Sequence, residues 1–338
     1  MNSQVELRLN SKNIGPKIEV VCLGEALIDF LPAHAGQTLQ EAGLLKRVAG
    51  GSTANVAVGL ARLGRQAAFL GKLGDDPFGH FLRDTLLANK VDVSRLLLSN
   101  QANTGLTFAW TDPVAHHEAR YLFYRAAAAD RKLEAGEIDQ NWLGRAKILQ
   151  FGSLMLSVEP ARTALYTALA CARAQGLLTC YDVNMRLPAW PDHASARADM
   201  LSLLDSCDII KLNRYELAFL TGEQKLEKGV ARLWQPPCRL LIVTLDREGC
   251  YYLSNQAEGF APGFAVKVVD TVGAGDGFMA ALLAQLLNLG DTIFTDKTTL
   301  AQVCRYANAA GAITTMRAGA IPALPTRRQI ERFLKVMN

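Results

Sequence analysis

Residues 270–278 read Asp-Thr-Val-Gly-Ala-Gly-Asp-Gly-Phe, and an apolar helical pattern over 276–289 continues directly from this stretch. A helix start carries unpaired N–H groups and a partial positive charge. Because glycine lets backbone approach an anion closely, Gly273, Ala274 and Gly275 are expected to cradle a phosphate. The carboxylate of Asp276, in the first turn, would normally repel a phosphate. Its presence there is explained if it accepts a proton from an attacking hydroxyl. The alternative is an aspartate that only caps the helix.

Outward from this stretch, short apolar runs alternate with helical patterns. The strand candidates are 18–23, 67–70, 147–151, 177–182, 207–211 and 240–244, and the helical patterns are 52–63, 78–89, 160–175, 195–205, 215–234 and 297–316. Strand and helix in repeat predict an α/β fold, a mostly parallel sheet with helices on both faces. Three layers, αβα, follow from this arrangement.

Two segments break the alternation. Residues 30–48 are spotted with glycine, and 104–110 and 119–124 are rich in aromatic and β-branched residues around a polar turn region at 112–113. They predict a small antiparallel sheet, formed by about 30–48 and 101–126, that is inserted as a lid over a site. The alternative is a surface hairpin without a functional role. Residues 1–17 are polar and predict an N-terminal extension before a single domain over 18–338.

Composition excludes several functional classes. The 36 basic and 32 acidic residues give a net charge of +4 without a basic run, so no nucleic-acid partner is expected. Seven cysteines without a CxxC pair predict reduced core thiols. No apolar run approaches a membrane span, and the first 17 residues lack the apolar core of a signal peptide. We therefore expect that the protein has no membrane partner and that it is cytoplasmic.

Paired glycines also precede the helical pattern at 52–63. Gly50 and Gly51 allow tight backbone contact with a ligand, and Asn55 follows in the first helical turns. An amide offers both a donor and an acceptor, which suits a sugar diol. The alternative is a glycine turn with Ser52 as an N-cap.

Polar residues follow two of the strand candidates. Asp29 comes after the first strand, where parallel sheets bind ligands and where a carboxylate can accept two hydroxyl hydrogen bonds. Asp182, Asn184 and Arg186 alternate along an extended segment, so they project to the same side. Arg186 can fork onto a polar ligand. The alternatives are a turn aspartate and a surface ion pair. Further along, Asn213 and Glu216 are three apart and share a helical face.

Taken together, and in their order along the chain, these stretches resemble the motifs of the ribokinase family, also called the phosphofructokinase-B (PfkB) family. The usual family motifs are GGxxxN, NxxE and DTxGAGD, and the resemblance runs from residue 18 to about 325. It implies a ribokinase-like fold, an ATP-dependent sugar kinase, Asp276 as catalytic base and an anion hole at 273–276. It also implies sugar contacts at Asp29, Gly50, Gly51 and Asn55.

The resemblance extends to nucleotide and metal sites. It implies Mg²⁺ near Asn213 and Glu216, partly through water, which agrees with the oxygen ligands that Mg²⁺ prefers. Residues 244–249, Thr-Leu-Asp-Arg-Glu-Gly, are similar to the nucleotide loop TLGxxG, with contacts at Thr244, Asp246 and Gly249. Asp246 replaces the first glycine, and aspartate tolerates a left-handed backbone. Asn308 is expected near adenine or ribose, and Asp270 with the 318–320 turn at a monovalent cation such as K⁺.

The choice of sugar depends on local similarity. Arg186 to Pro191, and 123–125 followed by 129–130, resemble plant and bacterial fructokinases, which adds Arg125 to the substrate-binding set and implies fructose and its 6-phosphate. The Asp182, Asn184 and Arg186 pattern also occurs in 2-keto-3-deoxygluconate kinases, so that activity remains an alternative, and a non-catalytic sugar sensor is a remote one. A nicotinamide enzyme and a P-loop kinase are excluded, because neither motif is present. Lid pairing between subunits predicts a homodimer.

Overall fold

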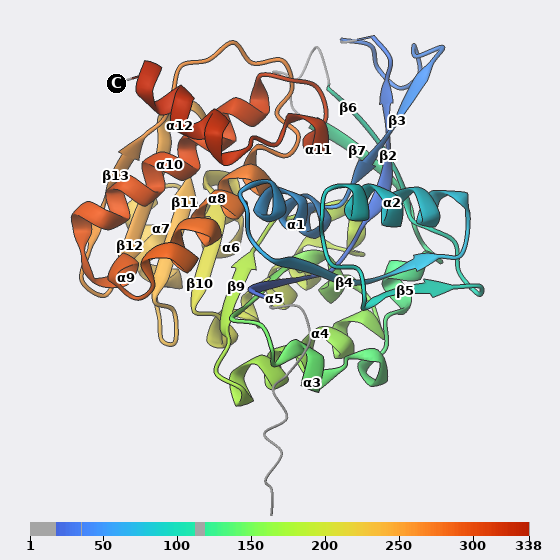
Figure 1. The fold of residues 1–338 in the computed structure, drawn as a ribbon, viewed down its shortest axis with the longest axis horizontal. Coiled ribbons are helices and arrows are strands. Elements are labelled where there is room, and N and C mark those ends of the chain that lie inside the picture. Colours follow the sequence, from blue (N-terminus) through green and yellow to red (C-terminus); the bar gives the residue numbers. More distant parts are fainter. Residues whose placement is uncertain (1–17, 35, 112–118, 338) are drawn as a thin grey trace, which may run out of the picture.

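The computed structural model describes residues 18–34, 36–111 and 119–337, so the expected N-terminal extension and the 112–113 turn lie outside the described residues. A nine-stranded sheet in the order β13-β12-β11-β10-β9-β8-β1-β4-β5 forms the centre (Figure 1). Its strands are β1 (Val20–Leu23), β4 (Ala67–Gly74), β5 (Leu96–Ser99), β8 (Ile148–Gly152), β9 (Leu178–Asp182), β10 (Ile209–Asn213), β11 (Leu240–Thr244), β12 (Gly249–Ser254) and β13 (Glu258–Pro262). Strands β11 to β5 pair in parallel, and only the β11–β12 and β12–β13 pairs are antiparallel. The predicted mostly parallel sheet is confirmed.

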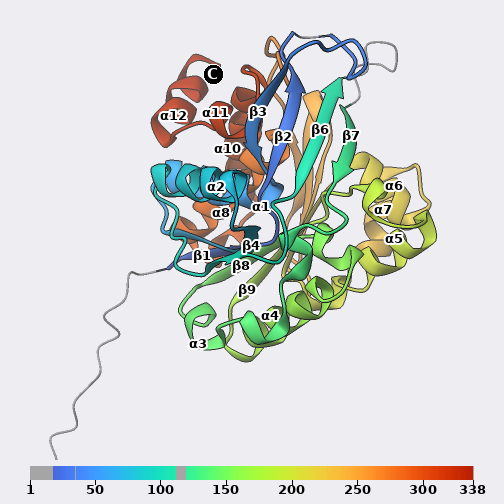
Figure 2. The same ribbon diagram turned by 90° about the vertical axis from the view of Figure 1, so that its right-hand side faces the viewer.

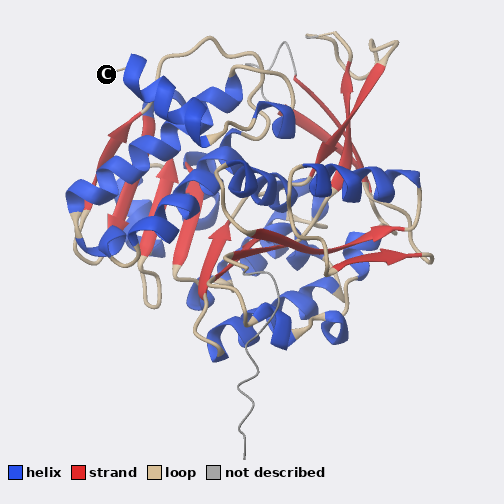
Figure 3. Cartoon of the chain, in the orientation of Figure 1, coloured by secondary structure: helices blue, strands red, loops and turns tan. Residues whose placement is uncertain are grey.

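Helices cover both faces of this sheet, as Figures 2 and 3 show. Successive residues of a strand point to opposite faces, so Val20 and Cys22 join one core while Val21 and Leu23 join the other. The first core includes α1 (Ser52–Arg62), α2 (Pro77–Ala88), α8 (Ala274–Leu289), α9 (Thr292–Thr295), α10 (Lys297–Thr315), α11 (Ala320–Ala323) and α12 (Arg327–Val336). The second includes α3 (Gln140–Leu143), α4 (Ala161–Ala174), α5 (His193–Leu201), α6 (Arg214–Thr221) and α7 (Leu226–Leu233). The three αβα layers are thus confirmed.

One predicted helix is two helices. The pattern over 215–234 divides into α6 and α7, because Gly222 follows α6 in the left-handed conformation with φ of 75° and ends it.

All seven cysteines are buried and unpaired. No helix in the described ranges combines the length and the apolar character that crossing a membrane requires.

A second, four-stranded sheet stands beside the main one, in the order β3-β2-β6-β7 (Figure 1). Its strands are β2 (Leu27–Pro32), β3 (Leu45–Gly50), β6 (Leu106–Thr111) and β7 (Ala119–Tyr124). It was predicted to be antiparallel, but its central pair, β2 and β6, is parallel. The reason is that β2 follows β1 and β6 follows β5, and β1 and β5 run in the same direction in the main sheet.

The second sheet is fixed to the body of the protein by aromatic packing. Phe30 of β2 stacks on Phe108 of β6 with ring centroids 5.3 Å apart, and meets Phe78 of α2 edge-on at 6.1 Å. Strands β2 and β3 extend beyond the predicted limits of 30–48. As a result Asp29 lies within a strand of this second sheet and not at the end of the first main-sheet strand.

Candidate active site

A cavity of about 970 Å³ lies between the second sheet and the carboxyl ends of the main-sheet strands. Open parallel sheets commonly bind ligands at this edge. Most residues predicted to form a site line the cavity: Asp29, Gly51, Asn55, Asn184, Arg186, Asn213, Glu216, Thr244, Asp246, Gly249, Gly273, Ala274, Gly275, Asp276 and Asn308. Residues far apart in the sequence therefore meet in one place.

The start of α8 forms one wall of the cavity. Gly273 precedes the helix with φ of 82°, and a Cβ atom on it would lie 2.7 Å from that of Ala320. Glycine is therefore required there on both conformational and steric grounds. Among the N–H groups at this helix start, that of Ala274 donates to the carbonyl of Thr271 at 3.3 Å, whereas those of Gly275 and Asp276 have no acceptor within an α-helix. Gly273 provides no side-chain cap. The helix thus presents amide donors and its positive end to the cavity.

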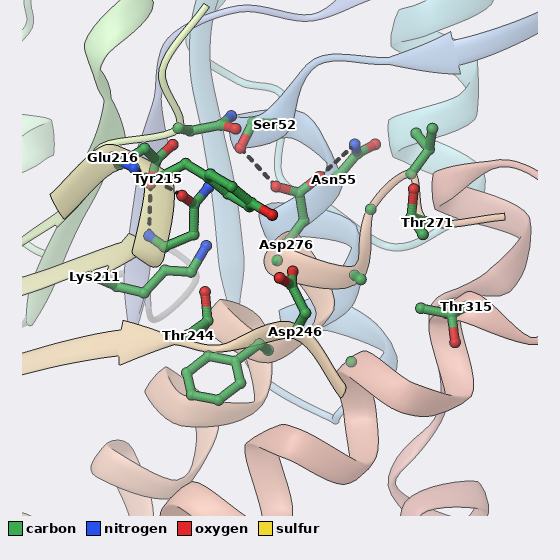
Figure 4. Close-up of a pocket in the computed structure, with 18 of the residues that line it drawn as sticks. Ser52, Asn55, Lys211, Tyr215, Glu216, Thr244, Asp246, Thr271, Asp276 and Thr315 are labelled. Atoms are coloured by element: carbon green, nitrogen blue, oxygen red, sulfur yellow. Dashed lines mark hydrogen bonds between the residues drawn. The ribbon is translucent and has the colours of Figure 1, made fainter. Parts of the chain in front are cut away.

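Asp276 lies in this first turn with its carboxylate on the cavity side, 8% exposed. Its Oδ1 atom accepts a hydrogen bond from the hydroxyl of Ser52 at 2.6 Å, and its Oδ2 accepts one from Nδ2 of Asn55 at 2.8 Å (Figure 4). Both donors belong to α1. The starts of α1 and α8 therefore meet at one oriented carboxylate. A carboxylate that merely caps its own helix would not have these contacts.

Residues of the second sheet form another wall of the cavity. Asp29 of β2 faces the cavity, and a Cβ atom at position 50 would lie 2.0 Å from its Oδ2, so Gly50 permits the position of this carboxylate. Burial raises the pKa of Asp29 to about 7; the positive charge of Arg186 opposes the shift, while Asp276 and Glu25 add to it. This carboxyl group is accordingly poised to change its charge near neutral pH.

Arg186 joins the main body of the protein to the second sheet. Its guanidinium lies over the ring of Tyr121 in β7, 4.9 Å from the ring centroid, and its Nη1 donates to the carbonyl of Met185 at 2.9 Å. Both Arg186 and Tyr121 line the cavity. A cation–π contact between these groups holds the arginine against the second sheet.

Asn213 and Glu216 form a reciprocal capping box at the start of α6. The N–H of Glu216 donates to Oδ1 of Asn213 at 2.9 Å, and the N–H of Asn213 donates to Oε2 of Glu216 at 2.7 Å. Oε1 of Glu216 accepts from the N–H of Met185 at 2.7 Å. Each carboxylate oxygen keeps a further lone pair that a water molecule can use. The group therefore suits a hydrated Mg²⁺ better than direct ligation.

The residues predicted to form a nucleotide loop lie at the carboxyl end of β11 and in the turn that follows it. Asp246 adopts φ of 50°, the left-handed conformation that its replacement of glycine requires, in a short turn over Asp246–Glu248. Thr244, Asp246 and Gly249 all line the cavity. Asn308 also lines it, but its Nδ2 donates to the carbonyls of Ala261 and Pro262 at 2.9 and 3.1 Å. Its amide donor thus ties α10 to the end of β13.

Four predicted residues contact other protein groups and do not line the cavity. Gly50 lies behind Asp29, and Arg125 is buried in an ion pair with Asp130. Asp182 is fully buried and accepts two hydrogen bonds from Nζ of Lys211, at 3.0 and 2.9 Å.

The fourth of these residues is Asp270. It accepts from the N–H groups of Val272 and Gly319 at 3.0 and 2.7 Å, and so ties the loop before α8 to the 318–320 turn. That turn is the one named with Asp270 in the expected monovalent-cation site. The carboxylate holds the two segments together through backbone hydrogen bonds.

Several residues that line the cavity were not predicted as site residues, and Ser52, Tyr121 and Lys211 are three of them. Ser52 was considered only as an N-cap, yet its hydroxyl goes to Asp276. Tyr121 was counted only among the aromatic residues of a lid strand. Lys211 lies at the end of the apolar run 207–211 and lines the cavity. A lysine in an otherwise buried strand was the available signal for the last of these.

Comparison with known proteins places this geometry in a family. Residues 17–327 match the family model of pfkB family carbohydrate kinases. Fructokinase-2 of Solanum habrochaites is 42% identical over 317 residues, which are 94% of this chain and 96% of the relative. A crystal structure of fructokinase with bound ATP from Xylella fastidiosa matches with a TM-score of 0.86 at 29% identity, over 95% of this chain and 99% of that one. Fructokinase from Vibrio cholerae O395, with fructose, ADP and calcium bound, matches with a TM-score of 0.82 at 30% identity, over 94% and 99%. The chain belongs to the pfkB family of carbohydrate kinases.

Proposed function

We propose that this carbohydrate kinase transfers the γ-phosphoryl group of ATP to the 6-hydroxyl of fructose. The observation that carries the proposal is the carboxylate of Asp276, held by Ser52 and Asn55 at the amino terminus of α8 and facing the cavity. Similarity over nearly the whole chain to proteins named fructokinase supports fructose as the acceptor.

The reaction requires a base and a site for the transferred charge at the same place. Asp276 accepts the proton of the sugar hydroxyl as its oxygen attacks the γ-phosphorus. The amide donors at 273–276 and the positive end of α8 stabilise the charge that spreads over the phosphoryl oxygens. Most of the rate then comes from position and electrostatics.

The two substrates enter from opposite ends of the cavity in this proposal. Asp29, Gly51, Asn55 and Arg186 bind the sugar beneath the lid sheet. The phosphates of ATP lie toward the start of α8, and its nucleoside lies along Asn213, Thr244, Asp246, Gly249 and Asn308. Closure of the lid, formed by about 30–48 and 101–126, would exclude water and limit ATP hydrolysis.

Cations complete the proposed site. Mg²⁺ would be held through water by Asn213 and Glu216, whose oxygens keep free lone pairs, and it supplies neutralisation of the phosphate charges when bound. A monovalent cation such as K⁺ would lie beside Asp270 and the 318–320 turn.

We also propose a cytoplasmic location, which fractionation of the source cells with an antibody against this chain would test.

The lid sheet is also proposed to pair with a second copy. Its outer strands β3 and β7 expose large apolar side chains, among them Leu45 at 39%, Leu122 at 41% and Tyr124 at 62%. Exposed apolar side chains on the edge strands of a small sheet favour association. Sedimentation analysis of the full chain should show a dimer, and Leu122→Glu should shift it toward the monomer. A monomer at all concentrations would contradict the proposed dimer.

A coupled assay of ADP release with fructose, 2-keto-3-deoxygluconate, ribose and adenosine tests the proposed activity. Fructose should give the highest kcat/KM, and its product should be fructose 6-phosphate. A preference for 2-keto-3-deoxygluconate would overturn the choice of sugar while leaving the mechanism intact. Sugar binding without ADP release would instead identify a sensor.

A further inference from the structure

We propose that Lys211 contacts the transferring phosphoryl group and that Asp182 positions it, a role that rests on the proposed kinase function. The juxtaposition that carries this inference is between the ammonium group of Lys211 and the first turn of α8. A Cβ atom built on Gly275 would lie 2.8 Å from Nζ of Lys211. The cation therefore lies against the amide donors that are expected to hold the phosphoryl oxygens.

The sheet register explains how a lysine reaches this place. Ile210 and Leu212 point into the core on the α4–α7 side of the sheet. Lys211, between them, points to the opposite face, the one that α8 covers. It lies near the carboxyl end of β10, where the sheet meets the cavity, and Figure 4 shows its side chain reaching in from that strand.

Asp182 fixes the ammonium group in one position. It lies opposite Lys211 in the parallel β9–β10 pair, and both of its carboxylate oxygens accept from Nζ, at 3.0 and 2.9 Å. Lys211 is 6% exposed and Asp182 is fully buried. Burial by itself would lower the pKa of Lys211, but the carboxylates of Asp182 and Glu216 outweigh it and hold the pKa above its usual value, so the group is cationic.

A purely structural role explains this pair poorly. Charges buried away from water are costly, and a well-packed apolar pair of similar volume is often as stable or more stable. Lys211 is buried on every side except the one that lines the cavity. On that side its ammonium group faces space that a phosphate would occupy. Three donor hydrogens serve two carboxylate oxygens and leave one for a ligand.

The chemistry follows from this geometry. The bond between the sugar oxygen and the γ-phosphorus forms as the bond to the bridging oxygen breaks, with its electron pair passing to ADP and the hydroxyl proton to Asp276. Negative charge spreads over the phosphoryl oxygens during this transfer. A preorganised cation in a water-excluded site stabilises that charge more than it stabilises bound ATP.

The first test compares two single variants of the full chain, Lys211→Gln and Asp182→Asn. The first removes the cation, whereas the second keeps it and removes only its anchor. We expect Lys211→Gln to lower kcat about 10²- to 10³-fold, as loss of one oxyanion donor does, and Asp182→Asn to lower it tenfold or less. Equal losses in both variants would assign the pair a structural role and overturn the proposal.

A second variant guards against misfolding. Asp182→Leu combined with Lys211→Met replaces the ion pair by apolar groups and should keep the melting temperature close to that of the wild type. We expect its kcat to remain as low as that of Lys211→Gln. The affinity for ADP with aluminium fluoride and sugar should fall by a similar factor, since this ligand mimics the transition state. Recovery of kcat in the double variant would refute the contact.

The wild-type assay separates this inference from the proposed function. If the wild type releases no ADP with any sugar, the kinase proposal fails and the role of Lys211 fails with it. If the wild type turns over and the double variant does so equally well, only the role of Lys211 fails.

Discussion

The hydroxyl of Ser52 donates a hydrogen bond to Asp276 across 224 residues of sequence, at 2.6 Å. Asn55 donates to the other oxygen of the same carboxylate. The glycine turn before α1 and the glycine turn before α8 thus build one site, in which the proposed base is oriented by the helix that was expected to bind only sugar. This contact makes the two motifs mutually dependent.

The first prediction concerns replacement of the proposed base, Asp276. Asp276→Asn keeps the size of the side chain and the helix start but removes the proton acceptor, so we expect kcat to fall by about 10²- to 10⁴-fold. Sugar affinity, measured by calorimetry, should change little. Near-normal turnover would remove Asp276 from the mechanism.

Loss of the Ser52 hydrogen bond is the second prediction. In Ser52→Ala the carboxylate of Asp276 keeps only the bond from Asn55, and hydrogen bonds to charged groups are worth about 1.5–3 kcal/mol. We expect kcat to fall roughly tenfold with KM for ATP unchanged. Asp276→Asn combined with Ser52→Ala should be no slower than Asp276→Asn alone. An additive loss would show that Ser52 acts independently of the base.

The third prediction concerns pH. The pKa of Asp29 is raised by burial to about 7, so the group is mostly protonated at pH 6 and mostly ionised at pH 8. If the carboxylate accepts the sugar hydroxyls, KM for fructose should fall roughly tenfold over this range, and Asp29→Asn should give a high KM that is independent of pH. A pH-independent KM in the wild type would contradict the role.

The same shift has a consequence for stability. A carboxyl group with a pKa above its unfolded value destabilises the folded state progressively as pH rises from about 4 to 7. Asp29→Asn should therefore raise the free energy of unfolding more at pH 8 than at pH 5, as urea titration can measure. An equal effect at both pH values would show that Asp29 ionises normally.

Much of the fold followed from pattern. The alternation of apolar runs and helical periods predicted the parallel sheet and its covering helices, because burial on both faces requires those runs. The pairing of β2 with β6 did not follow, since it depends on where two main-sheet strands end in space. The division of α6 from α7 depended on one glycine, Gly222, whose conformation the surrounding helical pattern concealed.

The site residues likewise fall into those that local sequence predicts and those that depend on tertiary structure. Motif residues such as Asp276 and Arg186 were predicted because their chemistry is visible in the local sequence, and both line the cavity. Asp182 was expected to face the ligand, but the structure pairs it with Lys211. That pairing depends on the register of β9 and β10, which one sequence does not disclose. Ser52 was misjudged for a similar reason, because its acceptor lies in a distant helix.

Arg186 provides the fourth prediction. Arg186→Ala removes the guanidinium near Asp29 and the contact with Tyr121. We expect KM for fructose to rise more than KM for ATP. Arg186→Lys keeps a charge but loses the planar fork, so it should restore sugar affinity only in part. An effect confined to ATP would overturn the assigned role.

The fifth prediction concerns Asp246, which occupies a left-handed conformation with φ of 50° at the position where the TLGxxG motif has its first glycine. Asp246→Asn keeps the tolerance for this conformation and removes the charge, whereas Asp246→Ala loses both. We expect Asp246→Ala to lower the free energy of unfolding by about 1 kcal/mol and Asp246→Asn to leave it nearly unchanged. Since the carboxylate lines the cavity at the proposed nucleotide end, both variants should lower KM for ATP by reducing repulsion of the triphosphate. Higher KM values in both would show instead that the carboxylate binds the nucleotide or its metal ion, and equal stabilities would show that the backbone conformation at 246 relaxes without cost.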